Sequence, residues 1–146
     1  MLCVNNHPEE YVDQCRSRVA EQVSAYQAMV AAARKEAAHT ARLDSAIAAF
    51  EPHSITTLGL ALDGYFVPRV RGKELNDGNA LNELKMLCNS MLNSNHILAA
   101  DETNTCDPAR SVLKYRVGDE IKLSEAGFLL LSTAFNAEIE MKYLRE

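Results

Sequence analysis

From Glu9 to Glu51 the chain contains no Gly or Pro, the two residues that most often interrupt a helix. Side chains that repeat at alternating spacings of three and four residues form an apolar stripe through this run, with few interruptions. The pattern predicts a long helix, or two helices with a tight joint, that packs one face against partner helices. The stripe consists of Val12, Cys15, Val19, Gln22, Tyr26, Met29, Ala33, Glu36, Thr40, Leu43, Ile47 and Phe50.

The joint between residues 36 and 44 has two interpretations. Thr40 or Asp44 can cap a second helix, and a break there permits an antiparallel hairpin within one chain. A continuous helix would be about 60 Å long at 1.5 Å per residue, which exceeds a compact domain of this size. The apolar stripe of such a helix could be covered only by a second copy of the chain, in a symmetric dimer. We favour the continuous or merely kinked helix, and with it a homodimer through this long N-terminal helix. Pro52 is expected to end the element.

Three shorter helices are predicted downstream. Ile55–Phe66 is apolar around most of its circumference, and its two glycines, Gly59 and Gly64, indicate close approach to another helix. Asn79 caps a helix over Ala80–Asn93, and Ser124 caps a last helix through about Leu144. The expected inner faces of these last two helices are Leu81, Leu84, Leu87, Cys88, Met91 and Leu92, and then Phe128, Leu131, Phe135 and Ile139.

A small β-hairpin is expected near residues 112–123. Leu113, Tyr115 and Val117 alternate with charged residues before a Gly-Asp turn. A three-residue loop at 118–120 keeps one face of the hairpin apolar, and residues 97–99 can join it. The predicted fold class is therefore mainly α, a helical bundle of four to five helices in a single domain spanning residues 1–146.

Composition excludes several classes of protein. A net charge of −5 and a pI of 5.4 argue against a nucleic-acid binder. No run is apolar enough to span a membrane, and the first residues lack the features of a signal peptide, so we expect a soluble cytoplasmic protein. The four cysteines form no Cys-x-x-Cys pair and are expected to be reduced thiols.

One metal motif occurs, at Glu36-Ala-Ala-His39. This Glu-x-x-His spacing places a carboxylate and an imidazole on one helix face. Carboxylate metal sites in helical bundles need two such pairs, and this chain has one. A metal-binding bundle is therefore an alternative, whereas an exposed turn is favoured, and we expect neither a metal nor another cofactor.

The loop between the second and third predicted helices is the candidate ligand site. It combines three cations with side-chain amide and acid groups, and it ends at a helix N-terminus, where backbone N–H groups favour anions. A small anion such as a phosphate is the predicted ligand, and an ordinary polar connection is the competing interpretation. Asp63 either pairs with the loop arginines or lies on a solvated strip. The candidate residues are Arg69, Arg71, Lys73, Asn76, Asp77, Asn79 and Asp63.

No nucleophile with its base is identifiable, so an enzymatic activity is not assigned. The heptad stripe favours a self-associating or partner-binding helical module. An anion-binding protein or enzyme that uses residues 69–79, and a metal-binding bundle, are the alternatives.

Overall fold

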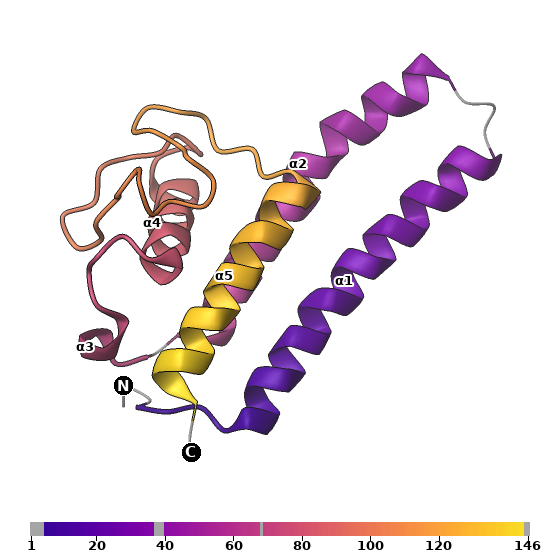
Figure 1. The fold of residues 1–146 in the computed structure, drawn as a ribbon. Helices are drawn as coiled ribbons and strands as arrows, with labels where there is room; N and C mark the ends of the chain where they lie inside the picture. Colours follow the sequence, from indigo (N-terminus) through magenta and orange to yellow (C-terminus); the bar gives the residue numbers. More distant parts are fainter. Residues whose placement is uncertain (1–4, 37–39, 68, 145–146) are drawn as a thin grey trace.

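The computed structural model describes residues 5–36, 40–67 and 69–144, and the side chain of residue 71 lies outside this description. The described residues form a mainly helical structure, as predicted (Figure 1). Its helices are α1 (Glu9–Glu36), α2 (Ala41–Tyr65), α3 (Arg71–Glu74), α4 (Ala80–Asn93) and α5 (Glu125–Tyr143). None of these helices is both long enough and apolar enough to cross a membrane.

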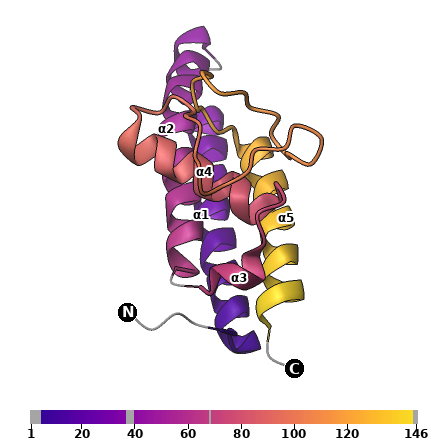
Figure 2. The ribbon, with the colours of Figure 1, turned by 90° about the vertical axis from the view of Figure 1, so that its left-hand side faces the viewer.

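Three of the helices form a layer that α4 crosses. α1 and α2 run antiparallel, and α5 lies along both of them (Figure 1). α4 packs against α2 and α5 and runs across their direction, which is clearest in the turned view of Figure 2. The long connection between α4 and α5 folds over the outer side of α4 (Figures 1 and 2).

The expectation of one continuous or kinked N-terminal helix is wrong. α1 ends at Glu36, and α2 begins at Ala41 after the N-cap residue Thr40. The Thr40 hydroxyl oxygen accepts a hydrogen bond from the Leu43 N–H at 3.2 Å, which satisfies one free donor at the start of α2. The antiparallel hairpin, our other interpretation, is what the chain adopts, and it packs α1 against α2. Residues 37–39 lie outside the described residues.

Pro52 does not end a helix, because it lies inside α2. A proline there removes one backbone bond, to the carbonyl of Ala48. Ala48 is exposed, and both residues line an open groove of about 800 Å³ beside α2. Solvent can therefore replace the missing donor, which makes the proline tolerable at this position.

The predicted hairpin at 112–123 is absent from the described residues. Lys114 has a φ of 61°, which interrupts the extended run that a strand requires. The backbone after it pairs with residues 96–98 instead: the Leu98 N–H donates to Asp119 O, and the Gly118 N–H donates to Leu98 O, both at 2.8 Å. The result is one isolated antiparallel bridge between Ile97 and Glu120.

The predicted inner faces of α4 and α5 are largely confirmed. Leu84 and all four predicted residues of α5 are fully buried in the core. Leu92 is the exception on α4, since it is 69% exposed. On α1 the predicted stripe is wrong at three positions, because Gln22, Met29 and Glu36 are exposed. Val23 and Val30 pack inward in place of the first two.

The two glycines of α2 differ in their surroundings. A Cβ atom on Gly59 would lie 3.3 Å from Leu123 Cδ1 and 3.8 Å from Leu84 Cδ1, so the predicted close approach of α2 to its neighbours occurs here. A Cβ atom on Gly64 would have no neighbour within 4 Å, so the same expectation is wrong there.

This contrast predicts opposite effects of the same substitution within one helix. Gly64→Ala should raise the free energy of unfolding by about 0.5–1 kcal/mol, since Ala loses less backbone entropy than Gly. Gly59→Ala should lower the free energy of unfolding, because the buried Leu123 side chain must shift, and overpacking costs about 1–3 kcal/mol. Urea denaturation of the two variants checks this, and equal shifts in both would contradict the packing described.

Candidate functional site

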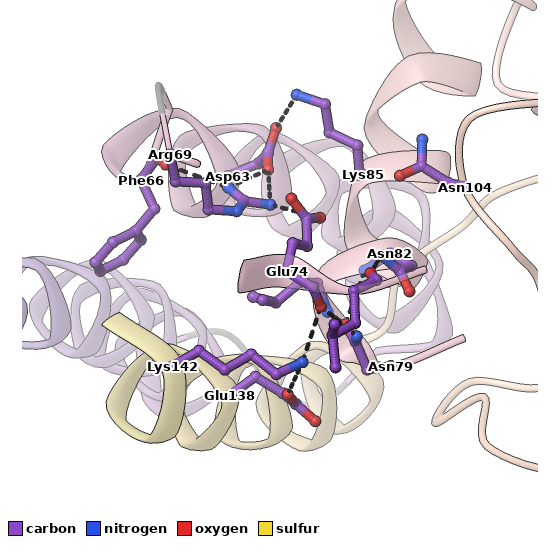
Figure 3. A network of polar contacts seen from close by, with 12 residues as sticks. Asp63, Phe66, Arg69, Glu74, Asn79, Asn82, Lys85, Asn104, Glu138 and Lys142 are labelled. Atoms are coloured by element: carbon purple, nitrogen blue, oxygen red, sulfur yellow. Dashed lines mark hydrogen bonds and ion pairs between the residues drawn. The ribbon is translucent and has the colours of Figure 1, made fainter. Parts of the chain in front are cut away.

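The predicted ligand loop begins at Arg69, whose side chain is only 3% exposed. Its guanidinium forms ion pairs with Asp63 of α2 at 3.4 Å and with Glu74 of α3 at 3.3 Å (Figure 3). Its Nη1 also donates a hydrogen bond to the Phe66 carbonyl oxygen at 3.2 Å. Asp63 is therefore buried and paired, the first of the two interpretations made for it.

A second cation completes the charge balance. Lys85 of α4 places its Nζ 3.4 Å from Asp63 Oδ2 (Figure 3). Two carboxylates thus face two cations, and we call Asp63, Arg69, Glu74 and Lys85 the Arg69 cluster. Buried charges are tolerated only when they are paired in this way. The Arg69 guanidinium also lies 5.7 Å from the centre of the Phe135 ring, so the cluster joins α2, α3, α4 and α5.

Two side chains at the end of α5 donate hydrogen bonds to backbone carbonyl oxygens of the same loop. Lys142 Nζ donates to the Glu74 carbonyl oxygen at 2.9 Å and pairs with Glu138 at 2.6 Å (Figure 3). The Tyr143 hydroxyl donates to the Val70 carbonyl oxygen at 2.8 Å. Burial, together with the nearby Glu74 charge, raises the pKa of Tyr143 to about 12, so this hydroxyl remains a neutral donor.

The amide side chains of the loop also bond within the chain. Asn79 Oδ1 caps α4 by accepting from the Leu81 N–H at 2.9 Å and the Asn82 N–H at 3.3 Å. Its Nδ2 donates to the Glu74 carbonyl oxygen at 2.8 Å. Asn76 Oδ1 accepts from the Thr105 N–H at 2.5 Å. These bonds fold the loop onto α4 and onto the connection that follows it.

The remaining charged residues of the loop have partners of their own. Asp77 pairs with Arg110 at 2.7 Å. Burial alone would raise the pKa of Asp77, but hydrogen bonds from Arg110 and Asn79 outweigh it and lower the pKa. Lys73 Nζ donates to the Asn5 carbonyl oxygen at 2.9 Å and to the Asn6 side chain. Each loop cation with a described side chain therefore contacts an oxygen of the chain itself.

The structure thus brings Asp63 and Arg69 together and ties Asn79 to Glu74, while Lys73 and Asp77 reach other segments. The side chain of Arg71 lies outside the described residues. Gly78 has a φ of 79°, and a Cβ there would lie 2.5 Å from Asp107 Cβ. The group that approaches the Gly78 backbone closely is therefore Asp107 of the chain itself. The geometry favours a structural role for the loop, and anion binding stays a prediction.

Sequence reasoning missed two residues that organise this region. Lys85 lies on α4 between inward-facing neighbours, and no spacing signal marks it as a partner of Asp63. Glu83 accepts hydrogen bonds from the Ser111 hydroxyl and from the backbone N–H groups of Val112 and Leu113, at 2.7 to 2.9 Å. No spacing in the sequence marks Glu83 as the partner of residues 111–113, which lie about 30 positions further along the chain.

The described thiols and acidic groups are not arranged for nucleophilic or metal chemistry. Cys15 and Cys88 are buried, and burial raises the pKa of the Cys88 thiol to about 12. Cys106 is exposed, but partial desolvation of its thiol, and then the charges of Glu83 and Asp107, raise its pKa. The higher pKa lowers the fraction of thiolate. Within the described part of the chain, no three His, Cys, Asp or Glu side chains converge on a metal position. Glu36 is exposed, and His39 lies outside the described residues.

The most unusual surface lies on the far half of the α1–α2 hairpin. We call residues 27–36 of α1 and 41–54 of α2 the arm. Gln27 contacts Glu125 at the start of α5, and past this point the hairpin projects beyond the other helices (Figure 1). None of the arm's residues is fully buried. Met29 is 51% exposed and Phe50 is 48% exposed, although the sequence pattern had predicted both on a covered face.

Comparisons of this chain with protein-family models, with curated proteins and with solved structures found no match. Any functional conclusion therefore rests on the geometry of the chain itself, and the two features that stand out are the internally paired Arg69 cluster and the uncovered arm.

Proposed function

We propose that the protein is a self-associating module in which the arm of one copy packs against the arm of a second copy. The observation that carries this proposal is the incomplete cover of the arm. Its inward residues Val30, Ala33, Leu43 and Ile47 are only half-buried, whereas the same faces of both helices are fully buried nearer the core. A two-helix pair buries too little apolar surface to cover itself.

The exposed apolar side chains of the arm lie together. The Tyr26 and Phe50 rings stack at 6.5 Å between centres, which places Phe50 beside α1. Met29 follows Tyr26 by three residues and so lies on the same side of α1. Grouped apolar side chains of this kind indicate an interaction surface, whereas apolar residues that are exposed singly are ordinary.

Charge supports a second copy as the occupant. The arm, with its connecting turn, contains three cations, Arg34, Lys35 and Arg42, and three acids, Glu36, Asp44 and Glu51. These cancel, so the rest of the chain carries the whole net charge of −5. Two copies that approach through their other surfaces repel each other, and approach through the neutral arms minimises this repulsion. Two hairpins related by a two-fold axis then complete a four-helix bundle.

The test compares two pairs of substitutions that make the same chemical change at different places. Met29→Glu with Phe50→Glu places charges on the arm. Met141→Glu with Leu130→Glu does so on α5, where the two side chains are 72% and 63% exposed. We expect wild type and the α5 variant to sediment as dimers and the arm variant to sediment as a monomer with unchanged helical circular dichroism.

A monomeric mass for wild type at the highest soluble concentration would contradict the proposal. A dimer that persists in the arm variant but is lost in the α5 variant would place the interface on α5 instead.

A further inference from the structure

At the end of the molecule opposite the arm, the segment before α1 holds a buried histidine. His7 is 6% exposed and lies among three aromatic rings from three helix ends. Its ring centre is 5.2 Å from that of Phe66, 5.5 Å from that of Tyr11 and 6.1 Å from that of Tyr143. The backbone N–H of His7 donates to the Tyr143 carbonyl oxygen at 2.6 Å, which holds this segment beside the end of α5 and places the imidazole among the three rings.

The surroundings of this ring are suited to a neutral imidazole. Its Nε2 is buried and has no hydrogen-bond partner among the described residues. The ionisable groups around it are Tyr11 from α1, Tyr143 from α5 and the guanidinium of Arg69, which follows α2. The carboxylates of Asp63 and Glu74 are paired with that guanidinium. A protonated His7 would place a second cation near Arg69 and would leave a charged N–H without an acceptor, which is costly in a buried site.

We propose that His7 makes the segment 5–8 an acid-sensitive latch, which is docked on the ends of α2 and α5 when the imidazole is neutral and released when it is protonated. A further contact of this segment joins Lys73 Nζ to the Asn5 carbonyl oxygen and to the Asn6 side chain. Release uncovers the Phe66 and Tyr143 rings.

The direction of the pH effect follows from the imidazole. Burial, and then the Arg69 charge, lower the pKa of His7 below 6.5 in the docked state. The released state has the ordinary pKa and so binds the proton more tightly. Docking is therefore fully favourable above pH 6.5 and weakens as the pH falls through 6.5 toward the docked pKa. Because one proton is linked to release, the opening equilibrium changes by at most about tenfold per pH unit.

Two measurements on the whole chain test the latch. Amide-exchange protection factors, which are corrected for the intrinsic effect of pH, should fall at the His7 N–H between about pH 6.5 and 5 while those of α4 stay constant. His7→Phe keeps an apolar ring and removes the titration, so its segment should stay docked and show no such fall. His53→Phe and His96→Phe, at exposed positions, are the matched controls and should behave as wild type.

The imidazole of wild type also titrates directly by NMR, which needs no variant. A His7 pKa at or above 6.5, or an equal loss of protection in His7→Phe, would overturn the latch. A fall in protection across α4 as well would show that acid unfolds the whole domain, and that result would also overturn it.

Discussion

Replacing Arg69 with Ala should lower the free energy of unfolding by about 3–5 kcal/mol. The substitution leaves the carboxylates of Asp63 and Glu74 buried, and Glu74 then loses its ion-pair partner. An unpaired buried charge costs far more than the net contribution of the pair itself. Urea or thermal denaturation, monitored by circular dichroism, measures the loss.

Two further variants separate this explanation from a general sensitivity to losing a cation. Arg110→Ala removes an exposed partner of Asp77 and should leave the melting temperature unchanged. The triple variant Asp63→Asn/Arg69→Met/Glu74→Gln removes the three buried charges and keeps only Lys85, whose side chain is 22% exposed. It should recover part of the stability that Arg69→Ala loses. If Arg69→Ala melts like wild type, the cluster has no structural role.

The Arg69→Ala variant also tests the anion site. Phosphate, nucleotides and small carboxylates should leave the melting temperature of wild type unchanged if the cluster is only structural. A ligand that raises the melting temperature of wild type but not of the variant would support an anion site, because a ligand stabilises by binding the folded state.

Replacing Phe135 with Ala should lower the free energy of unfolding by about 3–5 kcal/mol. The Phe135 side chain is fully buried, and its ring lies 5.6 Å from that of Phe66. Removing it leaves a cavity where α2, α4 and α5 meet, and Leu62→Ala or Leu84→Ala in the same core should cost about 2–5 kcal/mol. Leu130→Ala, exposed on the same helix, is the control and should change stability by no more than about 0.5 kcal/mol.

Phe135 and Arg69 should not behave as independent positions. The guanidinium lies over the Phe135 ring, so each side chain contributes to the environment of the other. A double-mutant cycle should therefore show a coupling energy of about 0.5–3 kcal/mol. Additive effects would mean that this contact contributes nothing, and a tolerated Phe135→Ala would mean that the inner face of α5 is misassigned.

The sequence determined the features that depend on near neighbours in the chain. Asn79 and Ser124 each provide a side-chain oxygen that accepts from the first turn of the next helix, so the starts of α4 and α5 were predictable. The three- and four-residue spacing of Phe128, Leu131 and Phe135 gave the buried face of α5 for the same local reason.

Features that depend on distant segments were not predictable. Thr40 offered a local cap for α2, but the choice of a hairpin over a continuous helix depends on the packing of α2 and α5 against α1. Pro52 continues α2 because its missing bond falls beside an open groove. The segment after residue 117 pairs with residues 96–98 rather than with its neighbours, since a contact across the fold takes its backbone donors and acceptors.

The same division applies to the candidate site and to the arm. The sequence placed cations beside Asp63, but only the tertiary structure buried Arg69, supplied Glu74 and Lys85 as partners and set the loop against α5. Likewise, the heptad pattern marked Met29 and Phe50 as apolar, and the length of α5 decided that they stay exposed. Periodicity and capping act within a few residues, whereas cover and charge pairing depend on which distant segments meet, and that is decided by the free energy of the whole fold.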